Sequence, residues 1–259
     1  METRRKLAVI GCGTMGKAIV GGLLRAGTIE SDHVFATTRR SGDAESLQED
    51  FGVTAGTDNV AACEAADVIV LTLKPQRLAA VIDSPQIAAA CAGKLVISVA
   101  AGVSIEQLAG HLPTSALIRA MPNTPCLIRA GMTVLARGPG VSDLQVGVAE
   151  TIFKAVGDVL ELEEKHMDAV TGLNGSGPAF VYVVLEALAD GGVMMGLPRE
   201  VATRLAAGVC EGAARMVLDT GFHPAALKDQ VTTPAGCTIA GLLTMEDGRI
   251  RSVLARTIQ

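Results

Sequence analysis

A glycine motif near the start of the chain constrains its fold more than any other feature. Gly11–Gly16 (GCGTMG) matches the pattern G-x-G-x-x-G. The motif directly follows the apolar run Leu7–Ile10 and opens an amphipathic stretch, which is the order of strand, turn and helix that it requires. The chain is therefore expected to begin with the first strand and helix of a doubly wound sheet, whose ligands bind at the carboxyl ends of the strands.

The three glycines have separate expected roles. Gly11 permits the tight turn, Gly13 lets the backbone approach a pyrophosphate, and Gly16 lets the helix pack on the strand. The N–H groups near Thr14 and Met15 would then face the phosphates at the positive end of the helix dipole. The motif predicts a dinucleotide site, and the alternative is a glycine-rich turn without a ligand.

The rhythm of the first part of the chain predicts a parallel sheet. Short β-branched runs alternate with Ala-rich segments such as Met15–Ala26 and Leu78–Ala90. Alternation of this kind is typical of a parallel sheet with helices on both faces. The expected strands are Leu7–Ile10, His33–Thr37, Val68–Leu73, Leu95–Val99, Ala116–Met121, Met132–Ala136 and Val156–Leu162.

From about Glu163 onward the pattern is helical. The expected fold class is α/β: a Rossmann-type doubly wound sheet over residues 1–162, followed by an all-helical domain over residues 163–259. The helix around Phe180–Leu188 is apolar on nearly every face, which indicates either a central core helix or, as we favour, a homodimer interface. The expected helices are Glu164–Gly172, Pro178–Met195, Pro198–Thr220, Pro224–Val231 and Thr238–Met245.

The end of the second expected strand indicates which nicotinamide cofactor fits. NAD-binding sites place an acidic residue there to accept from the ribose 2′-hydroxyl. This chain has Thr37, Thr38, Arg39 and Arg40 and no acid. Two guanidinium groups suit a 2′-phosphate, so NADPH is predicted, with NADH as a weaker alternative. The competing interpretation is a solvated charged turn.

Composition excludes several classes of function. Aromatic residues make up 2% of the chain and the net charge is −5, which argues against nucleic-acid binding. The six cysteines are scattered and are expected to be reduced, and no metal site is expected. The apolar run at the start is too short for a signal peptide, and the longest uncharged stretch contains Asn174, Ser176 and Pro178. A cytoplasmic protein without a membrane span is predicted.

The motifs in their order resemble one known family. GCGTMG, LKPQ, ISVAAG, RAMPNTP, DAVTGLNGSGPAF, EALADGG, GLPRE and LKDQVTTPAGCTIAGL are similar to the motifs of the pyrroline-5-carboxylate reductase family, and the resemblance covers essentially the whole chain. It implies an oxidoreductase of proline biosynthesis that reduces 1-pyrroline-5-carboxylate to L-proline by hydride transfer from NADPH. It also implies that the helical domain forms a homodimer or a higher homo-oligomer of dimers.

The resemblance also implies a set of site residues. The matching cofactor positions are Gly11, Cys12, Gly13, Thr14, Met15, Gly16, Thr38, Arg39, Arg40, Asn59, Leu73, Lys74, Pro75, Val99, Ala100 and Ala101. The matching positions for the cyclic imino acid are Val231, Thr232, Thr233, Gly236, Cys237 and Thr238. Three positions depart from the family's usual residues: Asn174 stands where serine is commoner, Phe180 where tyrosine is commoner and Ala235 where glycine is commoner.

The chemistry requires few protein groups. A protonated cyclic imine is electrophilic by itself, so no strong general acid is needed, and hydride transfer depends on placement and exclusion of water. Free N–H groups and the Thr238 hydroxyl at a helix start would hold the substrate carboxylate, and we predict a catalytic role for Thr238. The alternative is an ordinary N-cap by Thr238. Lys74 would contact the ribose–phosphate region or act as a rim charge.

Two rival functions remain open at the level of sequence. The same architecture could serve another imine or a β-hydroxy acid, but the latter needs a lysine as proton donor, and the helical part has only Lys165 and Lys228, outside the Gly-rich segment. A non-catalytic NADPH sensor would need the glycine motif but not the loop around Thr233–Thr238.

Overall fold

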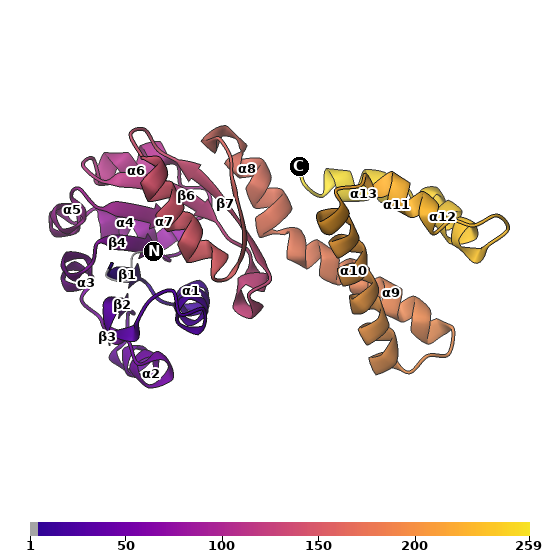
Figure 1. Ribbon diagram of the computed structural model, residues 1–259, viewed down its shortest axis with the longest axis horizontal. Helices are drawn as coiled ribbons and strands as arrows, with labels where there is room; N and C mark the ends of the chain where they lie inside the picture. Colours follow the sequence, from indigo (N-terminus) through magenta and orange to yellow (C-terminus); the bar gives the residue numbers. More distant parts are fainter. Residues whose placement is uncertain (1–4) are drawn as a thin grey trace. The chain divides into compact units, whose positions relative to one another are not determined.

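The chain divides into two compact units after Ser176. The computed structural model describes residues 5–259, and Figure 1 shows a sheet with helices in the first unit and helices in the second. The sequence places the domain boundary between residues 162 and 163, where strand β8 (Gly157–Glu161) ends. The segment from 163 to 176 makes its contacts within the first unit.

The first unit is built on one eight-stranded sheet with the order β3-β2-β1-β4-β5-β6-β7-β8. The order changes direction at β1, so the loops after β1 and β4 diverge at a topological switch point, where open α/β sheets bind ligands. The strands are β1 Leu7–Ile10, β2 Val34–Thr37, β3 Thr54–Gly56, β4 Val68–Leu71, β5 Leu95–Ser98, β6 Ala116–Met121, β7 Gly131–Arg137 and β8 Gly157–Glu161.

The expectation of a wholly parallel sheet is wrong at β7. Strands β1 to β6 pair with one another in parallel. Strand β7 pairs antiparallel with β6, with Met121 opposite Val134. The short connection between them contains only the 3₁₀ helix Thr124–Ile128, whereas a parallel crossover needs a dozen or more residues. The next connection holds helix α7 (Asp143–Lys154), and β8 accordingly returns parallel to β7.

Helices cover both faces of the sheet, as the sequence predicts. In β1, Leu7 and Val9 belong to one core cluster, with Ile19 of α1 and Phe153 of α7. The alternate residues of β1 belong to a second cluster formed with the helices of the opposite face. Because successive side chains of a strand point to opposite faces, a strand buried on both faces is apolar throughout, and all four residues of β1 are buried.

The Ala-rich segment Leu78–Ala90 is not one helix. It contains parts of α4 and α5, separated at Asp83 and Ser84, because Pro85 begins α5 and disfavours helical backbone at Ser84. The helices of this unit are α1 Thr14–Arg25, α2 Ser41–Phe51, α3 Asn59–Ala65, α4 Pro75–Ile82, α5 Pro85–Cys91, α6 Ile105–His111, α7 Asp143–Lys154 and α8 Met167–Val170. Short 3₁₀ helices cover Ser31–His33 and Glu164–His166, and a π-helical stretch, Thr171–Gly175, follows α8.

The second unit consists of helices joined by short loops. They are α9 Gly177–Met194, α10 Arg199–Thr220, α11 Pro224–Gln230, α12 Cys237–Asp247 and α13 Ile250–Arg256. Helices α9 and α10 pack on each other around Ala189, Ala202 and Ala206. Small side chains at this contact let the two helix backbones approach closely, as Gly192 does beside the Ala202 methyl group.

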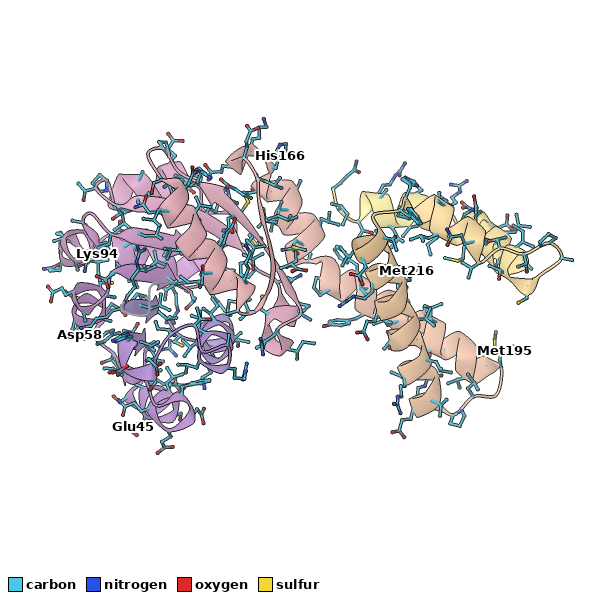
Figure 2. The ribbon with its side chains drawn as sticks, in the orientation of Figure 1. Glu45, Asp58, Lys94, His166, Met195 and Met216 are labelled. Atoms are coloured by element: carbon cyan, nitrogen blue, oxygen red, sulfur yellow. The ribbon has the colours of Figure 1, made fainter. Side chains whose placement is uncertain are left out.

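Most long apolar side chains of the helical unit are exposed. Tyr182 is 59% exposed and Val183 65%, and Met195 and Met216, labelled in Figure 2, are 80% and 48% exposed. An apolar surface of this extent on one chain marks an interaction site. The alternative that Phe180–Leu188 is a central core helix is therefore wrong for the single chain, and the interface interpretation is favoured.

The continuous helical segment Glu164–Met194 is long and apolar enough to cross a membrane, judged by length and composition alone. An 18-residue stretch of it has a mean hydropathy of 1.3, and 6% of that stretch is buried. Its first part is fixed to the sheet unit by polar contacts, because Glu164 and Asp168 bind Arg119 and Asn174 binds Asn123. Such contacts are typical of a helix that starts within a folded domain.

Candidate active site

A cleft of about 790 Å³ lies over the carboxyl ends of β1, β2 and β4, within the first unit. Its position at the switch point is where a doubly wound sheet is expected to bind its ligand. Most of the predicted cofactor residues from the first two strand ends line it. The lining residues are Gly11, Cys12, Gly13, Thr14, Met15, Lys17, Thr38, Arg39, Asp43, Ser46, Thr72, Leu73, Lys74 and Arg77.

The glycines of the motif are required for three different reasons. Gly11 has a φ of 79°, and a Cβ there would lie 2.3 Å from the Leu73 side chain. A Cβ on Gly16 would lie 2.9 Å from the Thr72 hydroxyl and 3.0 Å from the Cys12 sulfur, so α1 packs closely on β1 and β4. At Gly13 the nearest atom is 3.9 Å away, which leaves open space on the cleft side for a ligand's phosphates.

The start of α1 offers unpaired N–H groups to the cleft. Gly13 is the N-cap and no side chain caps the helix. The N–H of Lys17 is the first to bond within the helix, to the Gly13 carbonyl at 2.8 Å. Thr14 and Met15 line the cleft, and the N–H groups of a first turn bind anions.

Thr72 fixes the glycine turn from the neighbouring strand. Its hydroxyl contacts the carbonyl oxygens of Ile10 and Gly11 at 3.1 and 2.9 Å, so it donates to this pair of acceptors. Thr72 was not predicted from the sequence. A hydroxyl directly after the apolar strand β4 is the signal that could have found it.

The two arginines after β2 have different environments. Arg39 lines the cleft, whereas Arg40 makes a bidentate contact with Asp43, at 2.9 Å from Nε to Oδ2 and 3.2 Å from Nη2 to Oδ1. The hydrogen bond from Arg40 lowers the pKa of the Asp43 carboxyl. Arg40 thereby offsets the one carboxylate that lines the cleft, and Arg39 is left available for an anion.

Four cationic side chains line the cleft against that carboxylate: Lys17, Arg39, Lys74 and Arg77. Lys74 is the N-cap residue of α4, and Arg77 lies in the first turn of the same helix. Lys17 and Arg77 were not predicted, although Lys17 lies one helical turn after Gly13 and Arg77 three residues after Lys74. This excess of positive charge suits a polyanionic ligand such as a phosphorylated dinucleotide.

The remaining predicted cofactor residues lie outside the lining of this cleft. Pro75 lines a neighbouring groove of about 280 Å³ between α4 and α6. Ala100 is 1% exposed and donates its N–H to the Ser98 hydroxyl at 3.3 Å. Other residues not in the lining are Gly16, packed beneath the turn, Arg40, Asn59 at the start of α3, and Val99 and Ala101 in the loop before α6. Their contact with a cofactor stays a prediction.

The predicted substrate residues lie together in the second unit, on the loop between α11 and α12. Val231 and Thr232 directly follow α11, and the Thr232 hydroxyl donates to the Lys228 carbonyl at 2.8 Å. A Cβ on Gly236 would lie 2.7 Å from the Thr233 hydroxyl, so this turn needs a glycine. Ala235 has a φ of 59°, a left-handed backbone that costs most residues energy.

Helix α12 begins at Cys237, with Gly236 as its N-cap and no side-chain cap. The alternative that Thr238 is an ordinary N-cap is therefore wrong, because Thr238 is the second residue of the helix. The first-turn N–H groups of α12 lack both intrahelical acceptors and a capping side chain. The Thr238 side chain is thus free of a capping role.

The thiol of Cys12 is not poised for reaction, although it lines the cleft. Burial raises the pKa of the Cys12 thiol to about 12, and a protonated thiol is a poor nucleophile. Over the described residues all six cysteines are free, and those residues hold no group of three or more His, Cys, Asp or Glu side chains that could bind a metal ion.

Two family models match the chain. Residues 6–102 match a model described as NADP oxidoreductase, coenzyme F420-dependent. Residues 164–259 match a model described as pyrroline-5-carboxylate reductase dimerisation. The first match covers the strands and loops that form the cleft, and the second covers the helical unit with its exposed apolar surface.

Relatives that match over nearly their full length are named pyrroline-5-carboxylate reductase. The chain is 42% identical to a pyrroline-5-carboxylate reductase of Schizosaccharomyces pombe over 267 residues, covering 97% of this chain and 94% of the relative. It is 37% identical to the Escherichia coli reductase over 253 residues, covering 96% and 93%.

Solved structures agree with the sequence relatives. A pyrroline-5-carboxylate reductase from Coxiella burnetii matches with a TM-score of 0.91 and 33% identity, covering 98% of this chain and 94% of that one. A pyrroline carboxylate reductase from Plasmodium falciparum with NADP bound matches with a TM-score of 0.88 and 28% identity, covering 99% and 95%. With a Rossmann-type sheet domain, a cationic cleft at the switch point of the sheet and a helical dimerisation domain, the chain belongs to the pyrroline-5-carboxylate reductase family of oxidoreductases.

Proposed function

We propose that this chain reduces 1-pyrroline-5-carboxylate to L-proline with a hydride from NADPH. The observation that carries the proposal is the cleft of Gly11, Gly13, Arg39 and Lys74, open at the glycine turn and rich in cations, in a chain of this family. These residues fit a phosphorylated dinucleotide, because the turn leaves room for a pyrophosphate and because Arg39, unlike Arg40, forms no ion pair with a carboxylate of the described residues.

The first unit would bind and orient the cofactor. The first-turn N–H groups at Thr14 and Met15 would hold the pyrophosphate, and Arg39 with Thr38 would hold the 2′-phosphate. Lys17, Lys74 and Arg77 are further cations on the cleft wall. When bound, NADPH supplies the hydride, and the protein contributes placement of the nicotinamide at the loop Val99–Ala101.

The second unit would bind the cyclic imino acid. The N–H groups of Cys237 and Thr238 begin α12 without a cap and suit the substrate carboxylate. The Thr238 hydroxyl would hold the ring nitrogen, and the protonated imine needs no further acid. Val231, Thr232 and Thr233 form the rest of this loop.

The proposal includes assembly and location. The exposed apolar side chains of α9 and α10 favour a homodimer, and dimers of this kind can associate into a higher homo-oligomer. At the start of the segment Glu164–Met194, the side chains of Glu164 and Asn174 hydrogen-bond backbone groups of the sheet unit. These contacts favour a buried helix of the assembly over a membrane span. We expect a cytoplasmic enzyme that binds neither membrane nor nucleic acid.

The test is a spectrophotometric assay of NADPH oxidation by the purified full chain. Addition of 1-pyrroline-5-carboxylate should start oxidation, NADH should support a lower rate, and omission of the imine should abolish it. NADPH binding without oxidation would favour the non-catalytic alternative. Oxidation with another cyclic imine but not with this one would change the substrate.

A further inference from the structure

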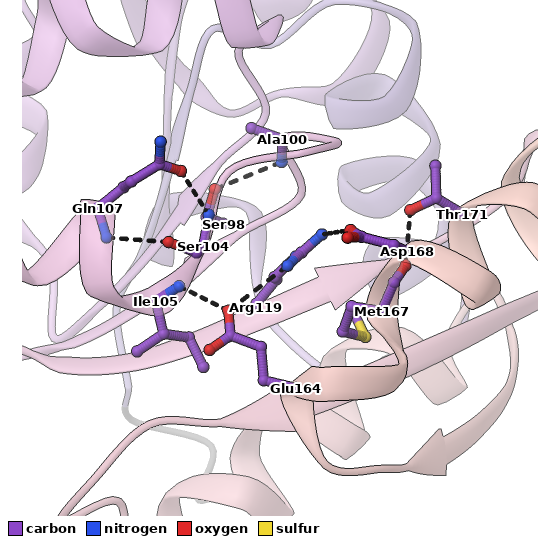
Figure 3. A network of polar contacts seen from close by, with 10 residues as sticks. All are labelled: Ser98, Ala100, Ser104, Ile105, Gln107, Arg119, Glu164, Met167, Asp168 and Thr171. Carbon is purple, nitrogen blue, oxygen red and sulfur yellow. Dashed lines mark hydrogen bonds and ion pairs between the residues drawn. The ribbon is translucent and has the colours of Figure 1, made fainter.

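A buried arginine of the first unit has no role in the cleft described above. Arg119, on β6, is 4% exposed and its guanidinium lies 3.5 Å from Glu164 and 3.3 Å from Asp168. Its Nε is buried without a hydrogen-bond partner. Burial of a charge is costly unless it is paired, and the two carboxylates that follow β8 offset the charge of Arg119 (Figure 3).

Glu164 makes a second contact that Asp168 does not share. The same carboxylate oxygen that faces Arg119, Oε1, accepts a hydrogen bond of 2.6 Å from the backbone N–H of Ile105. Ile105 is the first residue of α6, and its N–H has no acceptor within the helix. Asp168 has a side chain that is 93% exposed, and it contacts Arg119 but not α6.

The segment that ends at Ile105 is the loop of residues 99–104 after β5. Its front end is fixed because Val99 donates to the Leu71 carbonyl at 3.1 Å and Ala100 to the Ser98 hydroxyl at 3.3 Å. Its rear end is fixed by the capping box of Ser104 and Gln107 and by the bond from Ile105 to Glu164. Figure 3 shows both ends and the Arg119 network side by side.

Between these two ends the loop has a long backbone contact of its own, from the N–H of Val103 to the Ala100 carbonyl at 3.5 Å. Gly102 has a φ of 73°, and a Cβ there would meet no atom within 4 Å. Ala101 and Gly102 are exposed. The conformation of this part of the loop therefore depends on where its ends are held, and the contact furthest away in sequence is that of Glu164, 59 positions from Ile105.

We infer that Glu164, oriented by Arg119, is a positioning residue that sets the loop of residues 99–104 against the nicotinamide half of the cofactor. The inference rests on the proposed function, in which this loop receives the nicotinamide. Glu164 touches neither cofactor nor substrate in this account. Its role is to keep the start of α6, and with it the loop, in one place.

The experiment compares Glu164→Ala, Glu164→Gln and the matched control Asp168→Asn in the full chain. In Glu164→Ala, kcat should fall about tenfold, because a small displacement of the reacting groups is costly in rate. Glu164→Gln should stay within about threefold of the wild type, since its amide oxygen can still accept from Ile105. Asp168→Asn should change kcat by less than about twofold, because Glu164 still faces Arg119 and still accepts from Ile105.

Ligand binding separates positioning from loss of stability. NADPH and 2′-phospho-ADP-ribose, which lacks the nicotinamide, are titrated against each folded variant. Glu164→Ala should weaken the binding of NADPH severalfold and leave the affinity for 2′-phospho-ADP-ribose unchanged. Equal weakening of both ligands, or a Glu164→Ala kcat equal to that of the wild type, would overturn the inference. Because binding needs no turnover, an inactive wild-type chain would refute the proposed reaction and still leave the loop measurable.

Discussion

The side-chain amide of Asn123 donates a hydrogen bond of 3.0 Å to the side-chain oxygen of Asn174, 51 positions later in the chain. The Asn174 Nδ2 in turn donates to the carbonyls of Met121 at 2.9 Å and Met132 at 3.0 Å. Asn174 therefore ties the π-helical stretch Thr171–Gly175 to the end of β6 and the start of β7.

Replacement of Asn174 by serine should destabilise the protein. A shorter hydroxyl cannot bond both carbonyls and accept from Asn123, so at least one buried or half-buried group loses its partner, at a cost of about 1–3 kcal/mol. Urea unfolding at a fixed protein concentration measures the change. Asn174→Asp, which keeps the size and the acceptor but not the donors, should be destabilised too, and unchanged stability in both variants would contradict the network.

Arg39 and Arg40 should differ in their effect on the cofactor. Arg39→Ala should raise KM for NADPH about tenfold or more and leave KM for NADH nearly unchanged, because it removes a charge-assisted bond to the 2′-phosphate. Arg40→Ala should have a smaller effect on NADPH, since Arg40 is occupied by Asp43. Steady-state kinetics with both cofactors measures this, and equal changes for NADPH and NADH would refute the assignment.

Ala235→Gly should stabilise the α11–α12 loop. Left-handed backbone costs alanine about 1–2 kcal/mol, and glycine adds about 0.5–1 kcal/mol of unfolded-state entropy, so relief of strain should prevail slightly. Ala235 has the required φ of 59°. Thermal unfolding should show a small rise for Ala235→Gly and a fall for the control Ala226→Gly within α11. A fall of equal size in both would contradict the strain.

The Glu161 carboxylate should make stability depend on pH. Arg137 of β7 hydrogen-bonds Glu161 of β8, which lowers the pKa of that carboxyl below its ordinary 4.5. A carboxyl with a depressed folded-state pKa contributes stability above its unfolded pKa and loses it as pH falls through the folded one. The wild type should therefore have a higher free energy of unfolding than Glu161→Gln at pH 7. This difference should disappear as the pH falls into the acid range. A constant difference across that range would show that the pair is not coupled to titration.

Sequence alone predicted the strands well and their connections less well. The ends of β1 and β6 match the expected Leu7–Ile10 and Ala116–Met121, because a strand buried on both faces is recognisable as an uninterrupted apolar run. The direction of β7 could not be read, since periodicity is the same for either direction. The break in Leu78–Ala90 could have been predicted from Pro85.

For the candidate site, residues in local motifs were predicted from the sequence, and contacts between distant elements were not. Gly11, Arg39 and Lys74 lie in motifs of local sequence, and all three line one cleft. The pairing of Arg40 with Asp43 was also local, at a spacing of three residues, but sequence did not indicate that a carboxylate would line the cleft. The contact of Glu164 with Ile105 joins two elements across the fold, and no pattern in a single sequence marks it.

The reaction itself is tested most directly by following the transferred hydride. The full chain is incubated with 1-pyrroline-5-carboxylate and NADPH deuterated on the transferred position of its nicotinamide ring, and the product is analysed by mass spectrometry. We expect L-proline carrying a single deuterium in the same amount as the NADPH consumed, and far less of it from Thr238→Ala with NADPH still bound. NADPH left unconsumed, or proline formed without deuterium, would contradict the account.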